Sequence, residues 1–324
     1  MTSLPLPEWA SHAAVWIGFP SAADLWENDL APAQAEVAAF AAAVHADGAG
    51  EQVWLVAADE TAAAAARKLA PFSKVIIEPF GDIWLRDTGA IVAGTGADRR
   101  AQGFEFNGWG GKYDLPGDDS IGQRLAAEAA LPYSKAGWIL EGGAIDGDGS
   151  GTFITTQQCL LNPNRNPGFD KAEVEQRLHG DLGATRVVWL GNGLINDHTD
   201  GHVDNLARFV APNRVAIPEA TTNDPNAGAY AEAAEALLDA DLEVVAIPSP
   251  GQVERDGEII PASYMNFYIG NAAVVVPLYG APNDGAAVEA IQELFPDRKV
   301  VGLRADHVLT GGGSFHCISQ QVPE

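Results

Sequence analysis

The sequence predicts a mixed α/β fold that forms a single domain over residues 1–324. Strand-like apolar runs outnumber helical stretches, Ala-rich helical stretches recur along the whole chain, and no Ser/Gly-rich linker or break in composition divides it. A hydrophobic content of 47% is sufficient for a packed core, and a charged content of 19% is too low for a disordered chain.

The expected helices are short, rich in alanine and separated by strand-like runs. Either Asp59 or Thr61 is placed to cap the first turn of the second helix. We expect helices at residues 32–44, 61–69, 120–130, 171–178, 229–238 and 287–295. Strand-like runs bounded by turn residues lie at residues 53–57, 75–77, 151–156, 186–190, 214–217, 242–247, 272–277 and 299–303.

Charge and cysteine content restrict the partners and the compartment. The 19 basic and 44 acidic residues give a formal net charge of −25, which repels nucleic acids and anionic membranes. The charge serves either solubility or the attraction of a cationic small molecule. Apolar runs such as 272–278 are too short to span a bilayer, and residues 1–9 lack the basic region of a secretory signal. Two cysteines suit a reducing compartment, so we expect a cytoplasmic protein without membrane or nucleic-acid partners.

Residues 82–89, DIWLRDTG, place two acids, an arginine and a tryptophan in an otherwise apolar stretch. Burying such charges without partners is unfavourable, so Arg86 could form a structural salt bridge with an acid. The functional interpretation is that Asp87 is a carboxylate at the floor of a pocket, with Trp84 as an apolar wall.

A glutamate precedes two glycines in residues 140–144, LEGGA. The glycines permit a tight turn that leaves the Glu141 carboxylate uncrowded. Most glutamates in such turns lie at the surface, so the motif is compatible with a surface turn or with a carboxylate of a site.

The densest polar cluster is residues 196–205, NDHTDGHVDN, with two histidines and three aspartates. Imidazole and carboxylate are common metal ligands, but no cysteine and no second His-rich cluster lies nearby to complete a metal site. If the segment is a strand, Asp200, His202 and Asp204 point to one face. That arrangement suits a proton-transferring histidine beside acids that bind a cation, and we expect no metal.

A glycine-rich segment leads to Cys317 in residues 310–321, TGGGSFHCISQQ. The glycines permit close backbone approach, and thiol catalysis combines a cysteine with a histidine from elsewhere in the chain. Cys159 lies in an apolar segment, where a cysteine is usually inert. Cys317 is therefore the candidate nucleophile.

Five polar residues recur at nearly constant spacing. Asp87, Glu141, His202, Asn266 and Cys317 lie near the ends of successive strand–helix blocks, at intervals of 54, 61, 64 and 51 residues by subtraction. Such a period indicates repeated modules around a common centre, although the modules share no clear sequence identity.

Taken together and in order, seven motifs resemble the agmatine deiminase family: IWLRDTG, FNGWGGKYDLPGDD, LEGG, CLLNPNRNP, NDHTDGHVDN, ASYMNFYIGNAAVVVP and GGGSFHCISQQ. The resemblance begins at residues 7–9, PEW, and extends to the end of the chain. It implies a five-bladed α/β propeller of pseudo-symmetric modules that pairs into a homodimer. It also implies hydrolytic deimination of a guanidino compound, agmatine first, to N-carbamoylputrescine and ammonia through a covalent cysteine adduct.

The resemblance assigns roles to single residues. Cys317 corresponds to the nucleophile and His202 to the acid and base. Glu141 corresponds to the glutamate that orients this histidine and raises its pKa. Asp87 and Asp204 correspond to the carboxylates that bind the guanidinium. Addition and elimination need no cofactor, so none is expected.

Three aromatic or imidazole side chains are expected beside the substrate. Trp84 matches an aromatic residue of the family site. Trp109 lies in the Gly-rich segment 106–119, which is either a loop that closes over the substrate tail or a rigid surface turn. Family members that act on agmatine commonly read NDETDGH, whereas this chain has His198 in place of the glutamate.

Other functions stay open at the level of sequence. Free arginine carries an α-carboxylate that needs a basic partner, and the motifs contain few basic residues. This favours the decarboxylated amine, agmatine, as the substrate. Another guanidino compound is the alternative. A metal-dependent amidohydrolase built on residues 198–204 predicts inhibition by chelators and activity without Cys317. A non-catalytic binder of cationic amines and an amidinotransferase, in which an amine replaces water, are further alternatives.

Overall fold

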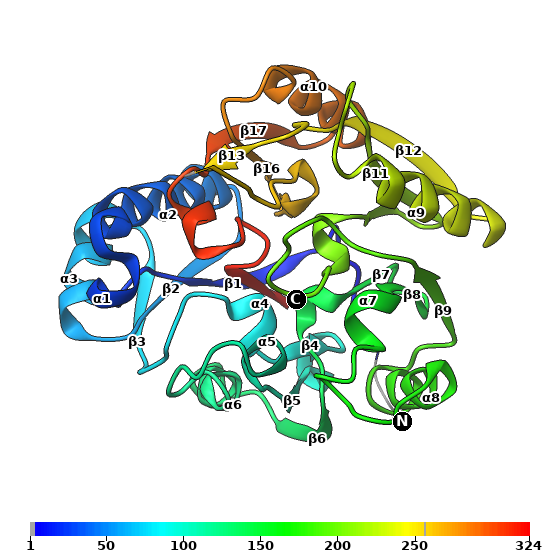
Figure 1. Cartoon of the computed structure of the whole chain (residues 1–324). Coiled ribbons are helices and arrows are strands. Elements are labelled where there is room, and N and C mark those ends of the chain that lie inside the picture. The colour runs from blue at the N-terminus through cyan, green and yellow to red at the C-terminus, as the bar shows by residue number, and fades with distance from the viewer. Residues whose placement is uncertain (1–3, 256) are drawn as a thin grey trace.

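In the computed structural model, which describes residues 4–255 and 257–324, most strands belong to five small sheets of the same construction (Figure 1). In each sheet a short first strand pairs antiparallel with a middle strand, and the middle strand pairs parallel with an outer strand. The sheets lie around the middle of the molecule in Figure 1, and the longer helices lie outside them.

The strands fall into three groups by their position in the sheets. The first strands are β18 (Ser319–Pro323), β4 (Ile91–Ala93), β7 (Ile145–Gly147), β10 (Arg208–Ala211) and β15 (Tyr268–Ile269). The middle strands are β1 (His12–Gly18), β5 (Arg100–Glu105), β8 (Thr152–Thr156), β11 (Arg214–Glu219) and β16 (Ala273–Leu278). The outer strands are β2 (Gln52–Ala57), β6 (Tyr133–Ile139), β9 (Arg186–Leu190), β12 (Glu243–Pro248) and β17 (Lys299–Arg304). β3 (Lys74–Ile77) extends the sheet of β2, and β13 (Glu254–Arg255) and β14 (Glu258–Ile259) form a separate hairpin.

Each middle strand is connected to its outer strand through a helix, as parallel pairing requires. These helices are α2 (Leu30–His45), α6 (Ile121–Glu128), α8 (Lys171–Leu182), α9 (Ala227–Asp239) and α10 (Asp284–Leu294), and α3 (Glu60–Leu69) connects β2 to β3. The shorter helices are α1 (Ala23–Trp26), α4 (Leu85–Thr88), α5 (Gly108–Gly111) and α7 (Gln157–Leu160). The six expected helices and eight expected strands are confirmed. Of the two candidate caps of α3, the structure selects Asp59, whose side chain accepts a hydrogen bond from the Ala62 amide.

A short helix precedes the first strand of four sheets and a turn precedes β18, and the four short helices contact one another in chain order. The turns are α4, the 3₁₀ helices Gly142–Ala144, Val203–Asn205 and Tyr264–Asn266, and the turn before β18. Each contains or directly follows one of the five evenly spaced residues Asp87, Glu141, His202, Asn266 and Cys317. The repeat in the sequence therefore brings five polar side chains to neighbouring turns.

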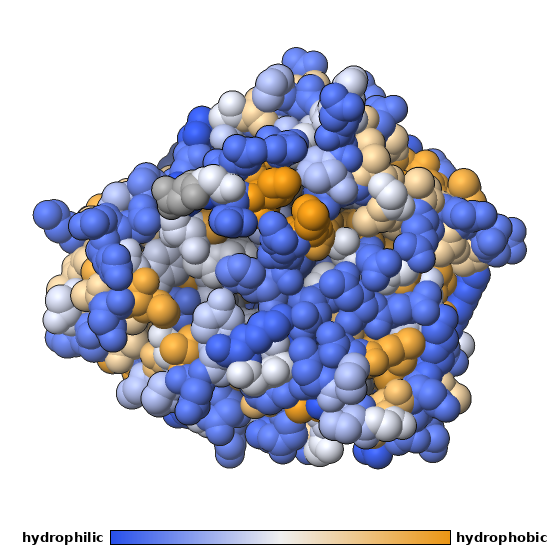
Figure 2. Space-filling view, viewed as in Figure 1, coloured by the Kyte–Doolittle hydropathy of each residue, from blue (hydrophilic) through white to orange (hydrophobic). Residues whose placement is uncertain are grey.

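Residues from both ends of the described chain share the largest buried apolar cluster, which includes Ala14 and Val322. β18 pairs with β1, with Trp16 opposite Gln320, so the turn that holds Cys317 is fixed to an N-terminal strand. Figure 2 shows a mostly hydrophilic face on which hydrophobic residues form small separate areas. Among the described residues, the model contains no helix whose length and apolar character would let it cross a membrane.

Candidate active site

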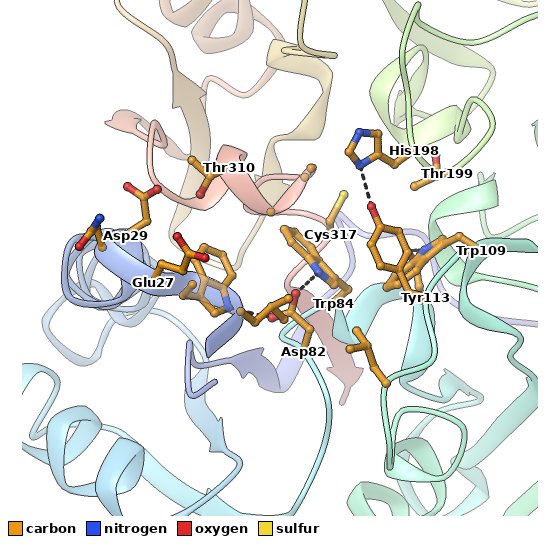
Figure 3. A pocket seen from close by; sticks show the side chains of 18 residues that line it. Glu27, Asp29, Asp82, Trp84, Trp109, Tyr113, His198, Thr199, Thr310 and Cys317 are labelled. Atoms are coloured by element: carbon orange, nitrogen blue, oxygen red, sulfur yellow. Dashed lines mark hydrogen bonds between the residues drawn. The ribbon is translucent and has the colours of Figure 1, made fainter. Parts of the chain in front are cut away.

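A pocket of about 310 Å³ opens above Cys317, and several predicted site residues line it (Figure 3). Asp87, Trp84, Trp109 and His198 all contribute to its wall. The lining, all from the described part of the chain, contains four acidic residues and no lysine or arginine. The remaining lining residues are Leu25, Trp26, Glu27, Asn28, Asp29, Asp82, Tyr113, Leu115, Thr199, Thr310, Gly311, Gly312 and Gly313.

The glycines before Cys317 make room for the indole of Trp84. A Cβ atom on Gly311 would lie 2.5 Å from Trp84 Cζ2, and one on Gly313 would lie 2.6 Å from Trp84 Cζ3. Asp82 holds this indole from the other side, accepting a hydrogen bond of 2.7 Å from Trp84 Nε1 and one of 2.9 Å from Trp26 Nε1. Trp84 is thus a fixed apolar wall beside Cys317, as the sequence predicted.

Three buried polar groups converge on Gly143 of the LEGG motif. A Cβ atom there would lie 2.7 Å from His202 Nδ1, 2.8 Å from Asp87 Oδ1 and 3.1 Å from Asp204 Oδ2. The glycine is therefore required for this packing, and its amide donates a 3.0 Å hydrogen bond to Asp87 Oδ1. His202 Nδ1 lies 3.6 Å from the same oxygen, so the motif gathers two carboxylates and an imidazole in one place.

The two aspartates expected to bind a cation have different environments. Burial and the nearby charge of Asp204 raise the pKa of Asp87 well above its ordinary value, although Trp109 Nε1 donates a 2.9 Å hydrogen bond to Asp87 Oδ2. Burial would also raise the pKa of Asp204, but the hydrogen bond and charge of His316 lower it overall. Asp204 Oδ1 is buried and has no hydrogen-bond partner among the described residues. Two buried carboxylates near each other are energetically unfavourable when no cation is bound, so the pair Asp87 and Asp204 is suited to bind a cation.

Glu141 is fully buried, so the surface-turn interpretation of its motif is wrong. Arg165 Nε donates a 2.6 Å hydrogen bond to Glu141 Oε1, and Arg165 Nη1 contacts Asp200 Oδ2 at 2.6 Å. Burial raises the pKa of Glu141 in spite of the Arg165 charge. Glu141 Oε2 faces His202 Nε2 at 4.0 Å, which places the acid beside the imidazole.

His202 does not have the raised pKa that was expected. Burial lowers its pKa to about 3, and the opposing effect of Asp204 is smaller. Glu141 is instead paired with Arg165, and neither ring nitrogen of His202 has a hydrogen-bond partner among the described residues. The imidazole is therefore neutral in the free protein and able to accept a proton.

Cys317 is held by Asn266, a residue that the sequence indicated only as one of the five evenly spaced polar residues. Asn266 Nδ2 lies 3.0 Å from Cys317 Sγ, and Asn266 Oδ1 accepts hydrogen bonds from the amides of His316 and Cys317 at 3.0 and 3.3 Å. Sγ also lies 3.5 Å from Asp204 Oδ2. Burial and the charges of Asp204 and Asp87 raise the pKa of the Cys317 thiol well above its ordinary value, so the free protein holds a thiol.

His198 lies at the exposed rim of the pocket and contacts the segment 106–119. Its Nδ1 lies 3.2 Å from the Tyr113 hydroxyl, and Lys112 Nζ donates to the His198 carbonyl at 2.6 Å and to Asp200 Oδ1 at 2.7 Å. The segment thus forms one wall of the pocket and is fastened to the 196–205 cluster.

The 196–205 segment is not a strand. Asp200 has a φ of +63°, and a 3₁₀ helix follows at Val203–Asn205, so the expected alternation on one face is wrong. His198, Asp200, His202 and Asp204 point to different partners, which removes the geometric basis of the proposed amidohydrolase site. Ligand atoms of Glu141, Cys159 and His202 do lie within 4.8 Å of one another. The Arg165 charge at Glu141 opposes a cation at that position.

Comparisons with known proteins identify the family of the chain. The family model described as Porphyromonas-type peptidyl-arginine deiminase matches residues 5–323. An agmatine deiminase of Stutzerimonas stutzeri is 39% identical, with 98% of this chain and 94% of the relative aligned. The chain belongs to the agmatine deiminase family.

Two solved structures of this family have closely similar folds. The agmatine deiminase of Enterococcus faecalis, described as catalysing its reaction, has a TM-score of 0.94 and 32% identity, covering 99% of this chain and 96% of its own. A cysteine-to-serine variant of the C. jejuni agmatine deiminase with substrate bound has a TM-score of 0.89 and 27% identity, covering 100% and 97%. The mixed α/β class predicted from sequence is confirmed.

Several residues of this agmatine deiminase family site were not predicted. Arg165, Asn266, Glu8 and His316 lie in quoted motifs, so their positions were visible but their partners were not. Asp82 was noted only as one of two acids in its motif. Each acts through a contact with a residue distant in the sequence, such as the pair Arg165–Glu141, which spacing along the chain does not reveal.

Proposed function

We propose that the protein is a hydrolase that deiminates agmatine to N-carbamoylputrescine and ammonia through a covalent adduct on Cys317. The observation that carries the proposal is that two buried carboxylates lie near Cys317: Asp87 lines the same pocket, and Asp204, outside the lining, has its Oδ2 3.5 Å from Cys317 Sγ. The lining, all from the described residues, contains no lysine or arginine. The solved relative with substrate bound supports the same substrate class.

Binding of the guanidinium follows from the two carboxylates. A guanidinium offers N–H donors along its planar edges, which match carboxylate oxygens. Asp204 Oδ1 is a buried acceptor for which the described part of the chain offers no hydrogen-bond partner, and Asp87 lies on the pocket wall. The cation offsets the repulsion between the two acids, and in doing so it fixes its central carbon near Cys317 Sγ.

Adduct formation uses the neutral His202. With the guanidinium bound, positive charge near Sγ favours the thiolate, and the thiol proton passes to His202. Cys317 Sγ forms a bond to the guanidino carbon, and His202 returns the proton to one terminal nitrogen. The bond between that nitrogen and carbon then breaks and releases ammonia, leaving an amidino-thioether on Cys317.

Hydrolysis of the adduct repeats the proton transfers with water. His202, neutral again, takes a proton from water as the oxygen bonds to the carbon. The carbon–sulfur bond then breaks, and His202 returns its proton to the sulfur. The remaining hydroxyl proton passes to the released ammonia or to solvent, and the neutral ureido product leaves. Glu141 beside His202 stabilises the transient imidazolium.

The pocket favours a decarboxylated substrate over arginine. An α-carboxylate would meet an acidic lining that includes Glu27 and Asp29, with no lysine or arginine in it to pair with. The ammonium of agmatine suits the same surroundings. The indoles of Trp26 and Trp84 stack at 6.4 Å and provide an apolar wall for the alkyl chain.

Purified protein incubated separately with agmatine, arginine and a peptidyl-arginine tests this proposal, with ammonia and ureido product as readouts. We expect turnover of agmatine and at least about a hundredfold lower kcat/KM for arginine, because a buried unpaired carboxylate is strongly unfavourable. Faster turnover of arginine than of agmatine would refute the substrate assignment and leave the reaction intact.

The five like-constructed sheets support a five-bladed α/β propeller, which we propose as a single domain over residues 1–324. The support is the repeated strand order and the apolar cluster shared by both ends of the described chain. The homodimer and the cytoplasmic location stay predictions. Light scattering coupled to size-exclusion chromatography tests the first, and cell fractionation tests the second.

A further inference from the structure

A buried chain of charged groups runs from Asp204 to Glu8 behind Cys317, and the steps above use its Asp204 but neither His316 nor Glu8. His316 Nδ1 lies 2.7 Å from Asp204 Oδ2, and His316 Nε2 lies 2.8 Å from Glu8 Oε2. All three side chains are almost completely buried. Glu8 precedes His316 by 308 residues, so the N-terminal segment reaches the neighbour of the nucleophile.

The surrounding groups keep Glu8 charged. Arg208 Nη2 lies 3.0 Å and Arg86 Nη2 3.2 Å from its carboxylate, and the Ile269 amide donates to Glu8 Oε1 at 2.8 Å. Burial would raise the pKa of Glu8, but Arg208 and His316 lower it well below the ordinary value. Asp146 balances Arg208 from the far side at 3.3 Å.

The geometry fixes the two hydrogen-bond partners of His316. Its Nδ1 faces Asp204 Oδ2 and its Nε2 faces Glu8 Oε2, and an ionised carboxylate can only accept a hydrogen bond. A ring that carries protons on both nitrogens donates to both acids as a cation. The contact engages Asp204 Oδ2 and leaves Asp204 Oδ1, within the described part of the chain, as a buried acceptor without a partner.

We propose that His316, held by Glu8, is a positioning residue that keeps Asp204 ionised and oriented so that its free oxygen receives the substrate guanidinium. The inference rests on the proposed function. According to this proposal, substrate binding requires His316, which precedes the nucleophile, and Glu8 in the N-terminal segment. The His316 side chain is not part of the pocket lining, and its ring nitrogens face Asp204 and Glu8, so we expect it to act through Asp204.

The test measures the pH dependence of binding and turnover in His316→Leu and His316→Asn. Loss of the imidazolium raises the pKa of Asp204, so protonation at acid pH removes the guanidinium acceptor. We expect the acid limb of kcat/KM for agmatine to move up by about one pH unit or more in His316→Leu, with at least about tenfold weaker binding at pH 6. His316→Asn retains one hydrogen-bond donor toward Asp204, so we expect it to shift the acid limb of kcat/KM less than His316→Leu does.

His12→Leu is the matched control, because it removes another buried histidine that contacts a glutamate, Glu51, at 3.2 Å outside the pocket lining. We expect it to lower the melting temperature without moving the acid limb. Binding is also measured by calorimetry in a Cys317→Ala background with methylguanidine, which carries only the guanidinium. This arm tests the His316 role even if agmatine is not turned over.

Two results would overturn the proposal. In one, His316→Leu lowers kcat equally at every pH and leaves the acid limb in place, which indicates a purely structural role. In the other, combining His316→Leu with Asp204→Asn weakens methylguanidine binding by the product of the separate effects, which shows that the two residues act independently.

Discussion

At the scale of single residues, three buried acids beside one thiol have different partners. Glu141 is paired with Arg165, Asp204 with His316, and Asp87 accepts from the Trp109 indole and the Gly143 amide. Of these three acids, Asp87 alone has no arginine or lysine partner among the described residues, which matches its strongly raised pKa. The empty site thus has a deficit of positive charge that a guanidinium fills.

His198 is the position where this chain departs from the commonest family motif, and its substitution tests how the rim selects the substrate. In His198→Glu we expect the KM for agmatine to fall by about threefold to tenfold, because a carboxylate near a solvent-exposed ammonium contributes on the order of 1 kcal/mol. Steady-state kinetics check this, with His198→Gln as the neutral control. An equal KM in the two variants would exclude an electrostatic role.

At the scale of elements, the site depends on turns rather than on the strands that fold the chain. The eight predicted strands are apolar runs such as β16. β4, with the sequence IVA, is too short to be recognised as a strand, and β18, with the sequence SQQVP, is too polar. The turns were located because Asp87, Glu141 and Cys317 are chemically distinctive. Their helical geometry and the irregular backbone at Asp200 were not predicted, because neighbouring turns decide them.

Segment 106–119 ends at a buried carboxyl whose titration can be measured. Asp118 Oδ1 accepts a 2.7 Å hydrogen bond from the Gly81 amide, and burial raises the pKa of Asp118 to about 7. Its folded-state pKa is higher than its unfolded-state pKa, so its contribution to stability falls as pH rises from about 4 to about 7.

We expect Asp118→Asn to raise the melting temperature by about 2–6 °C relative to wild type at pH 7.5, and by less at pH 4.5. Asp119→Asn, an exposed neighbour, is the control and should show no such trend. A melting-temperature difference for Asp118→Asn that does not depend on pH would show that Asp118 does not titrate in this range.

At the scale of the whole molecule, the sequence repeat relates to how the site is assembled, and the net charge relates to how the substrate is attracted to it. The sequence intervals reflect five sheets of like construction, and the short helices before four of them contact one another in order. The repeat could be predicted because its members are chemically distinctive residues. The long-range partners Glu8, Arg165 and His316 could not, since they become neighbours only when the sheets assemble.

A net charge of −25 predicts attraction of a cationic substrate. We expect kcat/KM for agmatine to fall by about threefold or more between roughly 10 mM and 500 mM salt, because salt screens the long-range field. The melting temperature, followed in parallel, separates screening from unfolding. A kcat/KM that is independent of salt would assign the charge to solubility alone.

The most direct test of the account compares Cys317→Ala with Cys159→Ala in the agmatine assay, with intact-protein mass spectrometry during turnover and EDTA in a parallel sample. We predict that Cys317→Ala loses turnover by at least about 10⁴-fold and forms no adduct, whereas Cys159→Ala keeps activity and the amidino adduct. EDTA should change neither result. Turnover that persists in Cys317→Ala would contradict the covalent mechanism.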